Sequence, residues 1–122
     1  MGTTTNAIIA YGLPFEPEET DNKAVSAAFS LEDGGLEKLE AYAKEHDLDV
    51  VWHCSSEYAM YIIGHEAVVA RRGNPEALDF EKLSHAEIEY SKVNDDIEML
   101  CKKFNLPFDK TKLKWWLCSY WG

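Results

Sequence analysis

The C-terminal segment constrains the fold most, because it is the most aromatic stretch of an otherwise acidic chain. Residues 112–121 read KLKWWLCSYW. Side chains on a β-strand alternate between two faces, and beyond Trp115 both faces of this segment are apolar. Such a strand is typical of a position buried on both sides. We therefore predict that residues 112–121 form a strand within a sheet. A helix should cover one face, and another element, a second subunit or a partner should cover the other.

Further strands are predicted from short apolar segments rich in β-branched and aromatic residues. The tripeptide Gly64-His65-Glu66 lies between two of these segments and indicates a hairpin turn. Because the connections after residue 49 are short, the last three of these strands should form an antiparallel meander. The predicted strands are residues 6–13, 49–55, 58–63 and 67–71.

Helices are predicted where apolar residues recur at three- and four-residue spacing. This spacing occurs in residues 36–46 and 88–104, and residues 24–31 favour a further short helix. The pattern Ser84-His85-Ala86-Glu87 is a capping box at the start of the long helix. Asn105 is expected to end that helix in the left-handed conformation.

Together these segments predict an α+β fold in which a single domain spans residues 1–122. We expect a mainly antiparallel sheet of four or five strands, with one long and one or two shorter helices packed on it. A loop over residues 14–21, which contains two prolines, and a turn over residues 72–75 should connect these elements. Apolar residues make up 46% of the chain, which is too many for an acidic disordered protein.

The location of the protein is predicted from what its sequence lacks. No secretory signal pattern begins the chain, and the longest apolar run, residues 59–63, is far too short to span a membrane. Three cysteines at wide spacing, Cys54, Cys101 and Cys118, fit reduced thiols in the core. We therefore expect a cytoplasmic protein without a membrane partner.

The sequence carries no recognisable catalytic or metal-binding motif. Four histidines occur at spacings that fit no metal site, and there is no phosphate-binding glycine loop or hydrolase elbow. His53 and Cys54 are strand neighbours that point to opposite faces, so they cannot form a catalytic pair with each other. We therefore predict no catalytic residue, no metal and no cofactor. This favours a non-enzymatic role, with a catalytic use of one histidine left open.

Charge distinguishes between the possible partners. The formal net charge of −10 disfavours direct binding to nucleic acid. Acidic residues are dense in residues 76–98, and an acidic helix there could imitate nucleic acid on another protein. Lysines gather instead near the aromatic tail, where they would give the molecule one basic rim.

The aromatic tail is the leading candidate for a binding surface. Trp and Tyr are frequent anchors of protein interfaces, and lysines beside them could steer a partner. The leading hypothesis is a non-enzymatic module that binds another protein, with the chain itself a homodimer. The residues assigned to this surface are Trp115, Trp116, Tyr120 and Trp121 as anchors, with Lys112 and Lys114 beside them.

Two alternatives accompany this hypothesis. The first is a small-molecule or nucleotide-binding domain, with hydrolysis of the ligand left open. Its site would contain two cations, one histidine and one tyrosine, namely Arg71, Arg72, His53 and Tyr61. The second is a nucleic-acid mimic that acts through the acidic helix.

In its small size, acidity, reduced cysteines and the ending KWWLCSYWG at residues 114–122, the chain resembles the small accessory proteins encoded by tailed bacteriophages. Proteins of this kind often bind a host enzyme or defence complex and modify or block it. The resemblance implies an inhibitor or modulator of a host protein.

Overall fold

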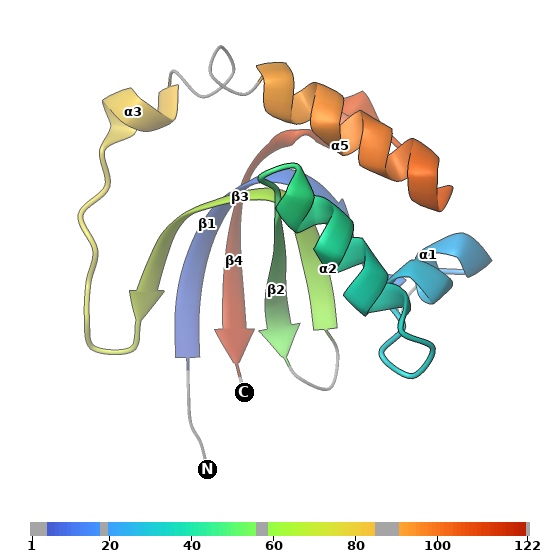
Figure 1. Cartoon of the computed structure of the whole chain (residues 1–122). Helices are drawn as coiled ribbons and strands as arrows, with labels where there is room; N and C mark the ends of the chain where they lie inside the picture. The colour runs from blue at the N-terminus through green and yellow to red at the C-terminus, as the bar shows by residue number, and fades with distance from the viewer. Residues whose placement is uncertain (1–4, 18–19, 56–58, 85–90, 122) are drawn as a thin grey trace.

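The computed structural model describes residues 5–17, 20–55, 59–84 and 91–121. Its elements form one mixed sheet of four strands with helices packed on it, which confirms the predicted α+β class (Figure 1). The strands are β1 (Thr5–Phe15), β2 (Asp49–Ser55), β3 (Ala59–Arg71) and β4 (Lys114–Trp121). The helices are α1 (Lys23–Ala28), α2 (Gly35–Glu45), α3 (Phe80–Ser84) and α5 (Ser91–Phe104), and the 3₁₀ turn η2 (Lys110–Lys112) leads into β4.

The four strands close on themselves in the order β1-β3-β2-β4. β1 is antiparallel to both β3 and β4, and β2 is antiparallel to β3. β2 and β4 are parallel and meet over two pairs only, Cys54 with Tyr120 and Ser55 with Trp121. The ring of strands therefore has one narrow seam, between β2 and β4.

The predicted hairpin at Gly64 is wrong, because residues 59–71 form the single strand β3. Gly64 lies opposite Gly12 of β1. A Cβ atom on Gly64 would lie 1.9 Å from the carbonyl oxygen of Tyr11, and a Cβ on Gly12 would lie 2.2 Å from that of Ile63. The glycine thus permits a close approach of two backbones rather than a turn. The register shifts between Ile9 and Ala10, as a β-bulge does.

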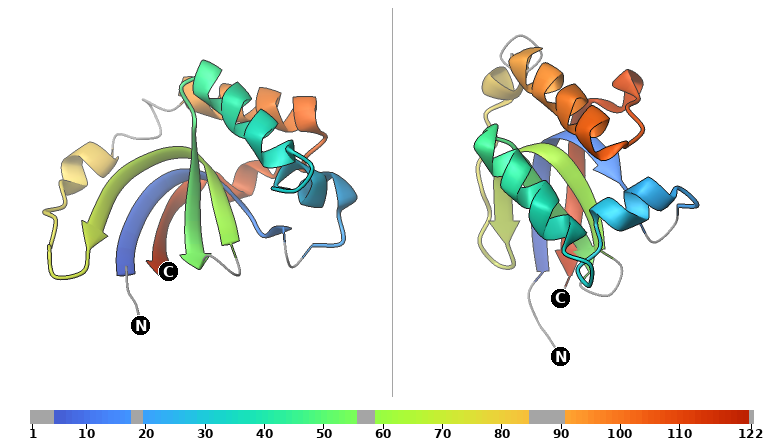
Figure 2. Two further views of the ribbon diagram at one scale, coloured as in Figure 1. Left: turned by 60° about the horizontal axis from the view of Figure 1, so that its bottom comes forward. Right: turned by 45° about the vertical axis from the view of Figure 1, so that its right-hand side comes forward.

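β1 and β3 bend together and form an arch, with a concave inner face and a convex outer face (Figure 2). Helices α1, α2 and α5 cover the half of the outer face next to the C-terminal end of β1, where Leu13, Phe15 and Ile63 join their core. A second, smaller apolar cluster lies on the inner face and contains Ile8, Ala10, Val51 and Ile62. Alternation along β1 explains the separation of the two clusters.

The helix predictions hold where the structure describes them. α2 matches the predicted segment 36–46, with His46 as its C-terminal cap residue. α1 begins after Asn22, whose side chain accepts hydrogen bonds from two backbone amides. Asn105 follows α5 with a φ of 56°, in the left-handed conformation expected of it. The capping box at residues 84–87 lies mostly outside the described residues, as does the predicted start of the long helix.

The connections differ partly from prediction. Pro14 and Phe15, expected in a loop, end strand β1. Residues 72–75 form a turn as predicted, in which the Asn74 amide donates to the carbonyl oxygen of Arg71 at 2.9 Å. Cys54, Cys101 and Cys118 are all free, and only Cys101 of the three is fully buried.

The C-terminal strand is confirmed as β4, but the prediction that both of its faces are buried is wrong. Leu117 is 78% exposed and Ser119 is also exposed. The opposite side chains, Trp116 and Cys118, pack on the inner cluster. The helices cover only the far half of the outer face, so the Leu117 side of β4 has no apolar layer over it among the described residues.

Candidate functional site

The predicted aromatic anchors fall on two opposite faces of the sheet. Trp115 lies on the outer face with Leu117, whereas Trp116 and Tyr120 lie on the inner face. The side chain of Trp121 lies outside the described part of the chain. Lys112 and Lys114 are exposed at the start of the strand. The sheet therefore separates residues that the sequence analysis grouped into one surface.

Both tryptophans have structural contacts. The Trp115 indole Nε1 donates to the carbonyl oxygen of Leu83 at 3.1 Å, and its ring meets Tyr11 edge-on at 5.5 Å between centroids. The Trp116 Nε1 donates to the carbonyl oxygens of Gly12 and Lys112, at 3.1 and 3.2 Å. Trp115 thus ties α3 to the sheet, and Trp116 ties the start of β4 to β1.

The outer face beside Leu117 is apolar and carries no charge. Ile9 of β1 lies between Leu117 of β4 and Val68 of β3, and Ala7 lies next to Ala70. These five side chains are exposed or half-buried. We call this set (Ala7, Ile9, Val68, Ala70 and Leu117) the bare outer face.

A groove of about 740 Å³ adjoins the bare outer face. It runs between β3 and the segment that leads to α3, and its lining combines the apolar Val68, Leu83 and Trp115 with acidic side chains, namely Glu66, Glu76 and Asp79. Two exposed side chains of the same segment, Leu78 and Phe80, extend the apolar surface. Exposed apolar patches of this kind typically mark sites of interaction with other molecules.

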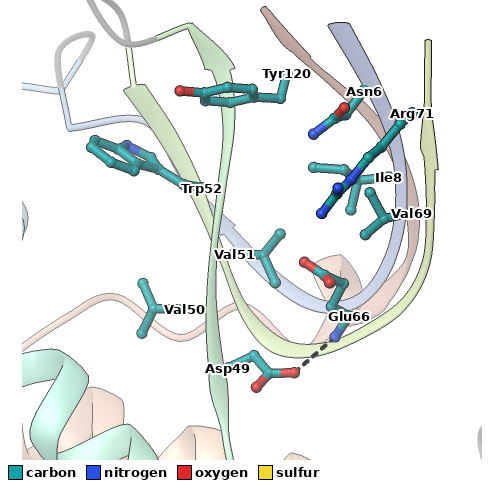
Figure 3. Close-up of a pocket in the computed structure, with 10 residues that line it drawn as sticks. All are labelled: Asn6, Ile8, Asp49, Val50, Val51, Trp52, Glu66, Val69, Arg71 and Tyr120. Atoms are coloured by element: carbon teal, nitrogen blue, oxygen red, sulfur yellow. Dashed lines mark hydrogen bonds between the residues drawn. The ribbon is translucent and has the colours of Figure 1, made fainter. Parts of the chain in front are cut away.

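The inner face lines an open cavity of about 620 Å³ between β2 and the arched strands (Figure 3). The cavity exists because β3 pairs with β2 only as far as Gly64, opposite Asp49, and then follows β1 away. Its volume falls in the range of roughly 300–1,000 Å³ that is usual for ligand pockets. We call it the inner cavity.

The inner cavity combines an apolar wall with polar side chains. Ile8, Val51 and Val69 face one another across it, and Tyr120 lies at one end, whereas the Trp52 side chain points to the other side of β2 (Figure 3). The polar side chains come from three strands and are Asn6 of β1, Asp49 of β2, and Glu66 and Arg71 of β3.

Two carboxylates lie close together at the bend of β3. The Asp49 Oδ2 accepts a hydrogen bond from the Glu66 backbone amide at 3.0 Å and lies 3.8 Å from the Nδ1 of His65. Partial burial raises the pKa of the Glu66 carboxyl, and the negative charge of Asp49 raises it further. This corner of the cavity is therefore suited to a cation or a hydrogen-bond donor.

Two buried polar atoms on the inner face have no hydrogen-bond partner among the described residues. They are the Asn6 Oδ1 and the His53 Nε2. Asn6 lines the cavity. His53 lies two residues after Val51 on β2, so the two side chains are on the same face of the sheet. Burial lowers the pKa of His53, and Glu16 opposes that effect. Unpaired buried polar atoms are costly, and both of these atoms are closed off from solvent.

The structure does not bring together the four residues of the predicted ligand site. Arg71 lines the inner cavity, whereas Arg72 is exposed in the turn after β3. Tyr61 is buried on the helix-covered side, stacked on Phe29 at 4.6 Å. Asn6, Asp49 and Glu66 line the cavity but were not predicted from the sequence. Alternation along residues 6–10 could have placed Asn6 beside Ile8, but nothing local relates it to Glu66.

Neither thiol chemistry nor a metal centre is indicated by the described residues. Burial, with a smaller effect of Glu98, raises the pKa of Cys101 to about 12, and burial also raises the pKa of Cys118. High thiol pKa values disfavour the reactive thiolate. Within the described ranges no group of three or more His, Cys, Asp or Glu side chains could hold a metal ion, and no helix is both long and apolar enough to cross a bilayer.

The described part of the acidic helix is mixed in charge. In α5, Asp95, Asp96 and Glu98 lie between Lys92 at the start and Lys102 and Lys103 at the end, and the Lys102 ammonium lies 3.9 Å from the Glu98 carboxylate. A continuous acidic surface that imitates nucleic acid has little support from this segment.

No protein-family model matches this chain, and no solved structure matches it at a significant level. Its function is therefore argued from the two surfaces described above, the bare outer face and the inner cavity.

Proposed function

We propose that this chain is a non-enzymatic protein-binding module that docks through the bare outer face, and that its first partner is a second copy of itself. The observation that carries the proposal is the 78% exposure of Leu117 at the centre of an uncharged, apolar part of the sheet. A leucine buried by a partner contributes roughly 1.5–3 kcal/mol, and a leucine left in water contributes none of this.

Charge favours a second copy as the occupant of this face. Two chains that each carry a formal charge of −10 repel one another unless their contact avoids acidic side chains. The bare outer face meets that condition, because its five side chains are all uncharged. A two-fold axis would place Leu117 of each copy against the same face of the other, so that one patch serves both sides of the interface. Two sheets pack face to face in this way at about 10 Å.

The test is the molar mass of the chain in solution, measured by light scattering over a range of concentrations. We expect the wild type to dimerise and Leu117→Asp to stay monomeric, because the carboxylate cannot be buried in the interface. Leu117→Thr, which keeps a high β-propensity, should also weaken the dimer. Met99→Asp is the matched control, since Met99 is 55% exposed but lies on α5, and it should dimerise normally. A monomeric wild type, or a Leu117→Asp variant that dimerises like the wild type, would contradict the proposal.

A different protein can dock on the same face, which is where the predicted modulation of a host protein would act. Lys112 is exposed in η2 and Lys114 at the first position of β4, on the inner side by alternation, so they would steer an acidic partner through a long-range, salt-sensitive attraction and not by contact on the outer face. Capture of the same bacterial protein by the wild type and by Met99→Asp, but not by Leu117→Asp, would support this role. Equal capture by all three would reject it.

A further inference from the structure

The inner cavity lies on the face of the sheet opposite the proposed docking surface, and it has features that protein docking does not use. Its polar side chains are one guanidinium, two carboxylates and one amide, arranged around an apolar wall (Figure 3). Such a mixture of one cation and two anions selects against a polyanion, which the two carboxylates would repel. It fits a ligand that itself carries both signs of charge.

Arg71 is the group suited to a carboxylate. Its guanidinium points from β3 into the cavity and towards Glu66 (Figure 3). Neither side chain forms an ion pair within 4.0 Å with any described residue. A planar guanidinium can bind a carboxylate through two parallel hydrogen bonds. Arg71 is therefore available to hold the acidic end of a ligand.

Glu66 and Asp49 are the groups suited to an ammonium. The Asp49 Oδ2 accepts a hydrogen bond from the backbone amide of Glu66 at 3.0 Å, so the Asp49 carboxylate lies at the base of the Glu66 side chain. Their mutual repulsion contributes to the raised pKa of Glu66. A cation placed between them would relieve this repulsion, because opposite charges favour the ionised form of an acid.

Asn6 lies opposite Arg71 on the β1 side of the cavity. Glu66 is opposite Ala10, four residues further along β1, so Asn6 and Glu66 lie at different ends of the cavity (Figure 3). The Asn6 Oδ1 is itself closed off from solvent, and the ammonium of a ligand is therefore assigned to Glu66 alone.

The rest of the cavity is suited to an apolar side chain. Ile8 and Val51 are buried and, with Val69, form the wall beside Arg71 and Glu66. At one end the ring of Tyr120 is positioned to contact an aromatic group (Figure 3). Aromatic pairs contribute beyond their buried area when they meet edge-on or offset.

From this arrangement we infer that the inner cavity is a binding site for a zwitterionic α-amino acid with a large apolar side chain. Arg71 binds the carboxylate, Glu66 binds the ammonium, and the apolar wall receives the side chain. The site lies on the opposite side of the sheet from Leu117, so it does not depend on the docking proposal.

The test is calorimetric titration of the full chain with L-phenylalanine and with two matched half-molecules. Phenethylamine has the ammonium and ring but no carboxylate, and hydrocinnamate has the carboxylate and ring but no ammonium. We expect L-phenylalanine to bind at least about tenfold more tightly than either half-molecule. Each half-molecule lacks one charged group, and the loss of one charged contact typically weakens binding by about this factor. Equal binding of all three compounds, or no binding of L-phenylalanine, would overturn the inference.

Substitutions assign each contact. Arg71→Gln should make L-phenylalanine bind no better than phenethylamine, and Glu66→Gln should reduce it to the affinity of hydrocinnamate. Arg72→Gln is the matched control, because Arg72 is the adjacent cation but does not line the cavity. An equal loss for Arg72→Gln would show a general electrostatic attraction and overturn the assignment. Thermal melting of each variant verifies that it is folded, and Arg71→Lys tests the planar fork separately from the charge.

A calcium titration provides a further test. The inference would be overturned if calcium binds saturably, if Glu66→Gln abolishes that binding, and if L-phenylalanine does not displace the ion. The carboxylates would then be assigned to a metal. Absence of such binding, together with the amino-acid result, supports it.

Discussion

The inner and outer faces of β4 are built from alternate residues of one strand, yet they have different surroundings. On the inner face, Trp116 is half-buried and donates two hydrogen bonds to backbone carbonyls. On the outer face, the next residue, Leu117, is 78% exposed and belongs to the bare outer face. Apolar character alone therefore does not distinguish a packing residue from a docking residue on this strand. The difference comes from which half of the arch the helices cover.

The largest effect is expected from a substitution that separates β1 from β3 where they bend together, because both faces of the sheet depend on that pairing. Gly64→Ala would place a Cβ atom 1.9 Å from the carbonyl oxygen of Tyr11, and neither backbone can move without unpairing β1 from β3. We expect a loss of more than about 3 kcal/mol in the free energy of unfolding, measured by urea denaturation. Gly73→Asn is the control, since Gly73 has open space around it and a φ of 81° that asparagine tolerates. A Gly64→Ala variant as stable as that control would contradict the close approach.

A pair of neighbouring substitutions on β4 compares the two faces directly. Trp116→Ala should lower the free energy of unfolding by about 3 kcal/mol, because it removes inner-face packing and the indole that donates to Gly12 and Lys112. Leu117→Ala should lower it by less than about 1 kcal/mol in the monomer, since the leucine is mostly in water. Equal losses, measured by denaturation at low protein concentration, would contradict the distinction between the faces.

The smallest expected effect concerns the pH dependence of the inner face. Burial lowers the pKa of His53 below its ordinary value of 6.5, so the folded chain favours the neutral imidazole. The corresponding stability is present above that ordinary value and is lost as the pH falls through it towards the lowered pKa. His53→Gln should therefore flatten the fall in melting temperature between about pH 7 and about pH 5. An unchanged slope would show that His53 does not titrate in this way.

Local pattern was sufficient for most of the elements. The bounds of β2 and α2, the left-handed Asn105 and the strand nature of residues 114–121 follow from alternation, helical spacing and capping. The misreading of Gly64 has a physical cause, because a glycine is required both in tight turns and where two backbones approach closely. Only the pairing with Gly12, which is distant in sequence, distinguishes these cases.

The functional surfaces were predicted less well, because they depend on register. Tyr120 and Arg71 were chosen from composition and do line the inner cavity. Their neighbours Asn6 and Glu66 belong to strands whose pairing the sequence does not specify. Acidic residues are also so frequent in this chain that no single one stands out. Leu117 was overlooked for the opposite reason, since burial on both faces was expected and only the incomplete helical cover reveals it.

The narrow contact between β2 and β4 has a consequence for motion. β2 is held to β4 by two residue pairs, and at this point Cys54 adopts a φ of 76°, which is uncommon for a residue with a side chain. Few backbone hydrogen bonds resist opening there, so we expect amide protons at this edge of β2 to exchange with deuterium sooner than those of β1, which is paired on both sides. Breathing of this kind would let the ring of strands widen to admit solutes of different size without unfolding the arch.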